Sequence, residues 1–339
     1  MIKKILVPLD GSRLAEKALP YAIWLAKRLD ASLIVTVAST LTGEEMGKDK
    51  NKNKENGKAK FETPEAYREV IRQTITDPAS ALSLVPHKLE IQVAYGEPVS
   101  EISEITFYEE VDLIVMANPR RKDFGYLFLG NLAAEVVRQA EVPVLLLNSN
   151  LAGEANQSLQ KALSNHTDNF TFEKGGNKIL LTLDGGVVAE SAIKVAVELA
   201  RQLRATLHLL RVVPEPDPGA AALIASSSVA LCEREKWFNR AVKYLERLQA
   251  ELLEKDLKCE QEVRSGQTSR KILEYAQELQ PTLVVMATHA RSRIGQIFLG
   301  SVAHEVTRQY PGPLILVHPS HFSKLDQCPG TVEQSTQPS

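Results

Sequence analysis

The residues best suited to chemistry lie near the end of the chain, where a predicted strand ending at Met286 runs into a loop. The loop combines small, cationic and hydroxyl-bearing residues, namely Ala287, His289, Ala290, Arg291, Arg293, Gly300 and Ser301. We expect Gly300 and Ser301 to open a helix, with Ser301 as its N-cap. Because free N–H groups at a helix N-terminus hold phosphate, this loop predicts a phosphate-binding site.

The same pattern occurs earlier in the chain and indicates an internal repeat. Residues 128–139 and 298–309 are identical at eight of twelve positions. Residues 5–11 and 179–185 are both apolar runs that end in Asp-Gly. Two matches in the same order indicate a duplicated domain.

Asp10 and Asp184 follow the first predicted strand of each repeat. A carboxylate at a strand tip can accept a hydrogen bond from a ribose or an adenine. An Asp-Gly turn that caps the next helix explains the same residues without any ligand. The sequence leaves both interpretations open.

Each repeat is predicted to alternate strands with helices. The expected strands are 4–9, 32–38, 89–93, 113–116 and 144–147, then 178–183, 206–212, 259–263, 283–286 and 314–317. The expected helices include 15–29, 64–82, 99–108, 129–139, 189–203 and 233–254. This alternation predicts parallel sheets covered on both faces, and Pro20 is expected to bend the first helix or crowd its first turns.

Composition bounds the possible functions. The chain has 339 residues, 24% charged residues and a net charge of −2, which predicts a globular protein and argues against a dedicated nucleic-acid binder. Its three cysteines are widely spaced and indicate a reducing cytoplasm rather than a disulfide framework or a zinc site. No apolar run reaches the ~18 residues of a membrane span, so we expect no membrane partner.

The polar segments divide the chain. We expect a first domain at 1–148 with a basic, flexible insertion at 43–62, a linker at 149–176, a second domain at 177–319 and a disordered tail at 320–339. The basic tract 47–60 is interpreted as solvated, with a phosphate or partner tether as the alternative.

With these motifs the chain resembles a tandem universal stress protein. That family carries G-x2-G-x9-G-[ST] before its last helix and strand. The second repeat has Ala287, Ala290, Gly300 and Ser301 at those positions, and the first has Ala117, Arg120, Gly130 and Asn131. Alanine in place of glycine would cost ~1–2 kcal/mol if the backbone needed a positive φ, and little otherwise. Arg120 would either block a phosphate channel or neutralise phosphate.

The resemblance implies an α/β fold: two Rossmann-like domains of the adenine nucleotide α-hydrolase type, each with a five-stranded parallel sheet flanked by helices. It also implies an ATP or AMP site. In the second repeat the implied binding residues are Thr182, Leu183, Asp184, Val212, Met286, Ala287, Ala290, Gly300, Ser301 and Val302. In the first repeat they are Pro8, Leu9, Asp10, Val37, Met116, Ala117, Arg120, Gly130, Asn131 and Leu132.

The function expected is that of a cytoplasmic stress-response regulator that binds ATP or AMP, mainly in the C-terminal domain, with Mg²⁺ or Mn²⁺ entering through the phosphates. No nucleophile–base constellation and no Walker P-loop is present, so we expect no enzyme beyond slow ATP hydrolysis. A non-binding scaffold or dimerisation module is the alternative. The recurring pairs Glu135–Arg138 and Glu305–Arg308 are interpreted as surface ion pairs.

The resemblance also concerns partners. Members of this family pair through their last strand, which is 143–147 in the first repeat and 313–317 in the second. Pairing within one chain and pairing between two chains in a homodimer are both open, and an unidentified protein partner is expected.

Overall fold

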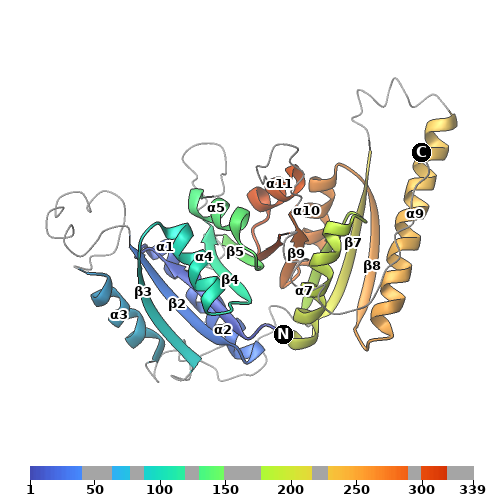
Figure 1. The fold of residues 1–339 in the computed structure, drawn as a ribbon. Helices are drawn as coiled ribbons and strands as arrows, with labels where there is room; N and C mark the ends of the chain where they lie inside the picture. The colour runs from blue at the N-terminus through green and yellow to red at the C-terminus, as the bar shows by residue number, and fades with distance from the viewer. Residues whose placement is uncertain are drawn as a thin grey trace.

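The computed structural model describes residues 1–39, 63–76, 88–118, 130–148, 177–215, 228–288 and 299–318. The predicted insertion, linker and tail lie entirely outside the described residues. Within the described part, ten strands form one sheet in the order β3-β2-β1-β4-β5-β10-β9-β6-β7-β8 (Figure 1). The first repeat supplies β1 (Lys4–Leu9), β2 (Ser32–Ser39), β3 (Leu89–Tyr95), β4 (Leu113–Asn118) and β5 (Val144–Asn148). The second supplies β6 (Lys178–Leu183), β7 (Thr206–Pro214), β8 (Cys259–Gly266), β9 (Leu283–Ala287) and β10 (Leu314–Val317).

The two halves meet at their last strands. Within each repeat the neighbouring strands run parallel, but β5 and β10 pair antiparallel, with Leu145 opposite Ile315. Both of these side chains are fully buried. The predicted five-stranded parallel sheets are therefore present, and they join within one chain as a single mixed sheet.

Helices cover both faces, as the strand–helix alternation predicted. The first repeat contributes α1 (Arg13–Glu16), α2 (Leu19–Leu29), α3 (Pro64–Thr76), α4 (Pro98–Tyr108) and α5 (Asn131–Gln139). The second contributes α7 (Val187–Leu203), α9 (Ser228–Leu253), α10 (Thr268–Leu279) and α11 (Ser301–Gln309). One core lies under α2, α3, α7 and α9, and the other under α4, α5, α10 and α11. Adjacent strand residues such as Leu6 and Val7 point into different cores, which is the two-residue period of a strand.

Pro20 was expected to bend the first helix or crowd its first turns, and the structure has two separate helices there. The chain forms the short α1, leaves the helix at Lys17 and Ala18, and restarts with Pro20 at the second position of α2. A proline ring clashes with the carbonyl four residues earlier inside a helix but fits its first turn. The second repeat has Lys194 at the corresponding place, and α7 runs through without a break.

All ten strand starts match the prediction, and the bounds that differ do so by one to six residues. The helix expected at 64–82 ends at Thr76, and the helix expected from residue 233 begins at Ser228. Strands β3, β7 and β8 continue two or three residues past their predicted ends. No helix within the described residues is long and apolar enough to cross a membrane.

The junction of β5 and β10 gives the first prediction. Leu145→Ala and Ile315→Ala should each lower the free energy of unfolding by about 2–5 kcal/mol, because each leaves a cavity in a buried sheet. Their effects should be non-additive by about 0.5–3 kcal/mol, since the residues are partners in one ladder. Urea denaturation of both single variants and the double variant measures this. Unfolding midpoints that rise with protein concentration would contradict pairing within one chain.

A second prediction concerns pH. Burial lowers the pKa of His208, and the nearby Glu260, 3.4 Å from its Nδ1, opposes this only in part. The unfolded chain therefore takes up the proton more readily, and stability should be lost as the pH falls below ~6.5. His208→Ile, which places the residue found at the matching position Ile34, should reduce this acid sensitivity. Urea denaturation between about pH 5 and 8, roughly 1.5 units to each side of the ordinary histidine pKa, tests this. Equal pH dependence of stability in both proteins would contradict it.

Candidate functional site

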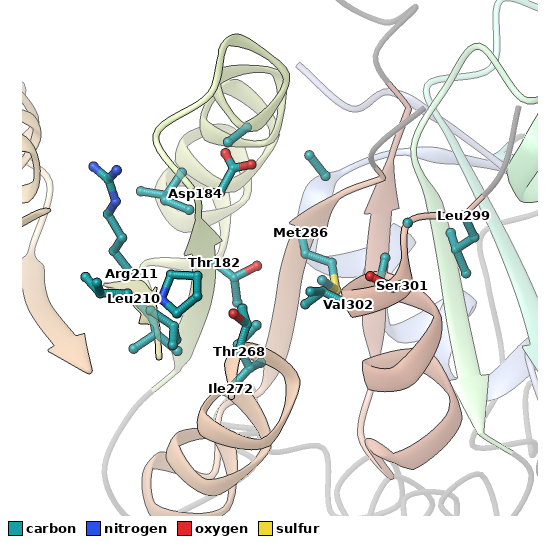
Figure 2. Close-up of a pocket in the computed structure, with 18 of the residues that line it drawn as sticks. Thr182, Asp184, Leu210, Arg211, Thr268, Ile272, Met286, Leu299, Ser301 and Val302 are labelled. Atoms are coloured by element: carbon teal, nitrogen blue, oxygen red, sulfur yellow. The ribbon is translucent and has the colours of Figure 1, made fainter. Parts of the chain in front are cut away.

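A cavity of about 590 Å³ opens at the carboxyl ends of β6, β7 and β9 in the second repeat (Figure 2). We call it the second-repeat cavity. It is lined by every predicted second-repeat residue that the structure describes: Thr182, Leu183, Asp184, Val212, Met286, Ala287, Gly300, Ser301 and Val302. Ala290 lies outside the described residues. Residues more than 100 positions apart in the sequence thus border one space, as parallel strand topology requires.

The cavity has an apolar interior and polar rims. Leu210, Ile272 and Met286 are buried side chains along its wall. Thr182, Thr268 and Ser301 add hydroxyl groups. Figure 2 shows Arg211 and Leu210 on one side of the space, and Ser301 and Leu299 on the other. Such a mixture suits a ligand with a flat apolar part and a polar part.

Two helix N-termini border this cavity. The prediction that Ser301 caps α11 is wrong by one position, because Gly300 is the N-cap and Ser301 is the first helical residue. Neither Gly300 nor Gln267, the N-cap of α10, provides a side-chain hydrogen bond to its helix. Among the described residues, no N-cap side chain therefore accepts from the first N–H groups of these helices, and a helix N-terminus of this kind favours an anion.

The first repeat differs at the corresponding helix. Glu97 caps α4, and its Oε2 accepts a hydrogen bond of 2.8 Å from the backbone N–H of Ser100. This hydrogen bond also holds the pKa of Glu97 below its usual value. A carboxylate thus already compensates the positive end of α4, whereas the neutral Gln267 leaves α10 uncompensated.

Asp10 and Asp184 both form the turn that the sequence allowed. Oδ1 of Asp184 accepts a hydrogen bond of 2.8 Å from the N–H of Gly186, and Asp10 makes the same bond to Ser12 at 2.9 Å. Both carboxylates remain exposed at the surface. The turn therefore accounts for one carboxylate oxygen, and Asp184 still lines the cavity.

Arg211 is a cavity residue that sequence reasoning missed. Its guanidinium stacks on the ring of Tyr244, 5.0 Å from the centroid, and packs against the backbone of Gly185. Among the described residues it forms no ion pair, so packing rather than a carboxylate holds it. A cation within the otherwise apolar run of β7 was the available signal. Trp237, Thr268 and Ile272 were missed as well, because each belongs to a helix whose placement depends on the tertiary fold.

The alanines at the first glycine position carry no backbone strain. Ala117 and Ala287 lie in β4 and β9, and neither is among the residues with positive φ. The position therefore needs only a small side chain, which alanine provides. Arg120 lies outside the described residues.

The predicted first-repeat residues gather at the same end of their own strands. Pro8, Leu9, Asp10, Val37, Met116, Ala117, Gly130, Asn131 and Leu132 lie at the carboxyl ends of β1, β2 and β4 or in the first turn of α5. Strand register pairs Leu9 with Val37 and Leu183 with Arg211, so the counterpart of Val37 is Arg211 rather than Val212.

Pro8 also shortens a ladder. β1 pairs with β4 only at Ile5 and Leu6, whereas β6 stays paired with β9 up to Thr182, the counterpart of Pro8. Proline has no N–H to donate, so the ladder cannot continue through it.

The start of α5 is linked to the second repeat by a chain of hydrogen bonds. Asn118 accepts a hydrogen bond from the N–H of Gly130 and donates one to Asn148, which in turn donates to the carbonyl of Tyr310. This chain of three hydrogen bonds connects the start of α5 to the end of α11. In the second repeat, Thr288 stands where Asn118 does and bonds to its neighbour Val317 instead.

Two further expectations concern charged groups. Arg138 pairs with Glu135 and Arg308 with Glu305, the latter at 2.6 Å, as predicted for helix ion pairs. Within the described ranges, no cluster of three or more His, Cys, Asp or Glu side chains is arranged to hold a metal ion.

The fold and the cavity define a class of protein: a tandem doubly wound α/β chain with a ligand-sized cavity at the carboxyl ends of parallel strands. The model of the universal stress protein family matches residues 1–148 and 176–318. The chain therefore belongs to the universal stress protein family, with two copies of its domain.

Individual relatives agree with this assignment. Universal stress protein YxiE of Bacillus subtilis is 28% identical over 151 residues, covering 42% of this chain and 98% of the relative. A universal stress protein of Thermus aquaticus is 32% identical over 147 residues, covering 43% of this chain and 99% of the relative. The crystal structure of a universal stress protein from Archaeoglobus fulgidus covers 93% of this chain and 98% of its own, with a TM-score of 0.63 and 17% identity. This last similarity shows the shared tandem fold.

Gly185 and Gly11 give a third prediction. Both have φ near +78° (+79° and +77°), but a Cβ on Gly185 would lie 2.6 Å from Arg211, whereas a Cβ on Gly11 would meet nothing within 4 Å. Gly11→Ala should cost about 1–2 kcal/mol of stability through its backbone alone. Gly185→Ala should cost about 0.5–1 kcal/mol more, because it displaces Arg211 from Tyr244.

Urea denaturation measures both variants. The matched control is Gly185→Ala in an Arg211→Ala background, where the additional loss should disappear. An additional loss that persists there would show that Arg211 is not its cause.

Proposed function

We propose that the chain is a regulatory protein that binds ATP or AMP in the second-repeat cavity. One observation carries this proposal: nine residues selected from the sequence border one cavity. Two helices also begin at this cavity, and neither has a side-chain cap. Binding would favour one arrangement of the surfaces that an unidentified protein partner contacts. The spacing of the cysteines makes a reducing cytoplasm the expected location.

The cavity suits each part of a nucleotide. Its volume, ~590 Å³, falls within the range of small-molecule sites. Leu210, Val212 and Met286 would provide an apolar surface for a base, and the Asp184 carboxylate would accept hydrogen bonds from ribose hydroxyls. The N–H groups that follow Gly300 would take the phosphates. Mg²⁺ or Mn²⁺ would enter with the nucleotide, held by phosphate oxygens and water.

Differences between the repeats favour the second one. Gln267 leaves α10 without a competing anion where Glu97 supplies one, and Ser301 adds a hydroxyl where the first repeat has Asn131. Arg211 adds a cation where Val37 is apolar. The first two differences favour an anion at the helix N-termini, and Arg211 adds positive charge on the side of the cavity opposite Ser301.

A scaffold is the second candidate, and the joined sheet favours it. A continuous ten-stranded sheet can present fixed surfaces without any ligand. In that case both repeats serve assembly alone. Slow ATP hydrolysis would be a side activity of either candidate.

The fourth prediction tests nucleotide binding by calorimetric titration of MgATP into nucleotide-free protein. Wild type should bind in the micromolar range, and Gly300→Val should abolish binding because a branched side chain fills the space before α11. Gly300 has φ −55°, so valine needs no strained backbone. Gly130→Val is the matched control, with φ −56° at the same place in the first repeat, and should leave most of the affinity intact.

The outcomes separate the candidates. An equal loss of MgATP affinity in both variants would contradict the proposal that the second repeat is the preferred site. Absence of heat and of thermal stabilisation at millimolar ATP would exclude nucleotide binding and leave the scaffold.

A further inference from the structure

Among the described residues, helix α9 forms a wall of the second-repeat cavity that is longer than its counterpart in the first repeat. It has 26 residues, whereas α3, which occupies the corresponding place, has 13. Its first turns stand beside the carboxyl ends of β7 and β8 (Figure 1). From this part of the helix, Trp237 lines the cavity.

The indole of Trp237 is unusually accessible for so large an apolar group. Its residue is 54% exposed, whereas the other tryptophan, Trp24, is 3% exposed in the core of the first repeat. The guanidinium of Arg240 lies over the Trp237 ring, 5.7 Å from its centroid. Arg240 thus engages one face of the ring, and a stacked planar group would use the other.

A second aromatic residue, Tyr244, indicates which side of α9 faces β7. Tyr244 lies seven residues after Trp237, which places both on one side of α9, about 10 Å apart along the axis. The Arg211 guanidinium stacks on Tyr244 and ties this side of the helix to the end of β7. Trp237 therefore belongs to the side of α9 that faces β7 and the cavity.

The position of α9 indicates which part of a bound nucleotide would lie beside it. Arg211 stands on one side of the cavity and Ser301 on the other (Figure 2). A nucleotide with its phosphates at the start of α11 would extend its base toward β7 and α9. The group that reaches Trp237 is then the base.

We propose that Trp237 stacks on the base of the bound nucleotide and makes this site selective for ligands that carry an aromatic base. This inference rests on the proposed nucleotide function. Stacking needs only a planar π surface, so it favours purines for their area, and it contributes nothing to a bare polyphosphate. The first repeat should lack this preference.

The test compares MgATP with inorganic tripolyphosphate, a ligand that lacks the base. Trp237→Ala should weaken MgATP about tenfold and change the tripolyphosphate affinity less than about twofold. Trp237→Phe should retain most of the MgATP affinity, because it keeps an aromatic face. Phe107→Ala is the control for removal of an exposed aromatic residue, since Phe107 is 66% exposed on α4 and does not line this cavity. It should bind both ligands as wild type does.

Tryptophan fluorescence gives an independent readout. MgATP should quench wild type and leave Trp237→Phe, in which only the buried Trp24 emits, unchanged. MgATP binding by calorimetry with no quenching, or undiminished affinity in Trp237→Ala, would overturn the stacking role and leave nucleotide binding in place. Equal losses for MgATP and tripolyphosphate would also overturn it, since they would reflect a displaced helix. Wild type that binds no MgATP would overturn both proposals.

Discussion

The antiparallel pairing of β5 with β10 is the constraint on which the rest of this structure depends. Each repeat ends its sheet with a strand of apolar side chains that are buried in the joined sheet. Left at an edge, such a strand would expose unpaired backbone groups and invite aggregation. Pairing satisfies both edges at once, and it places equivalent helices on the same face, so that α2 contacts α7 and the two repeats share continuous cores.

Duplication then allows the two repeats to diverge. Several substitutions at the strand ends change the local chemistry in a definite direction. A proline interrupts one ladder where threonine continues the other, and a carboxylate caps one helix where an amide leaves the other open. The first repeat also directs Asn118 and Asn148 toward Tyr310. The first repeat thus has side-chain contacts to the second, and the second has a cavity bordered by two helix N-termini without side-chain caps.

The candidate site was largely predictable, because its residues follow motifs in a fold whose strand ends converge. Residues on the strands and the α11 start, such as Thr182 and Gly300, lie where the topology of parallel strands places them. Arg211 and Trp237 were not predicted, although each had a signal in the sequence. Arg211 is a cation beside apolar residues of β7, and Trp237 is an aromatic residue in a long amphipathic helix. Neither signal indicates a cavity by itself. For Trp237 the reason is that packing against β7 and β8 sets the rotation of α9 about its axis.

The sequence by itself determined the duplication, the order of strands and helices, the break at Pro20 and the strand ends that border the cavity. These depend on local rules: periodicity, proline geometry and the small residues of a turn. Tertiary structure alone decided that β5 and β10 pair within one chain, that Gly300 rather than Ser301 caps α11, and that Arg211 and Trp237 reach the cavity. Each of these depends on contacts between residues far apart in the chain, whose geometry becomes fixed only when the cores close.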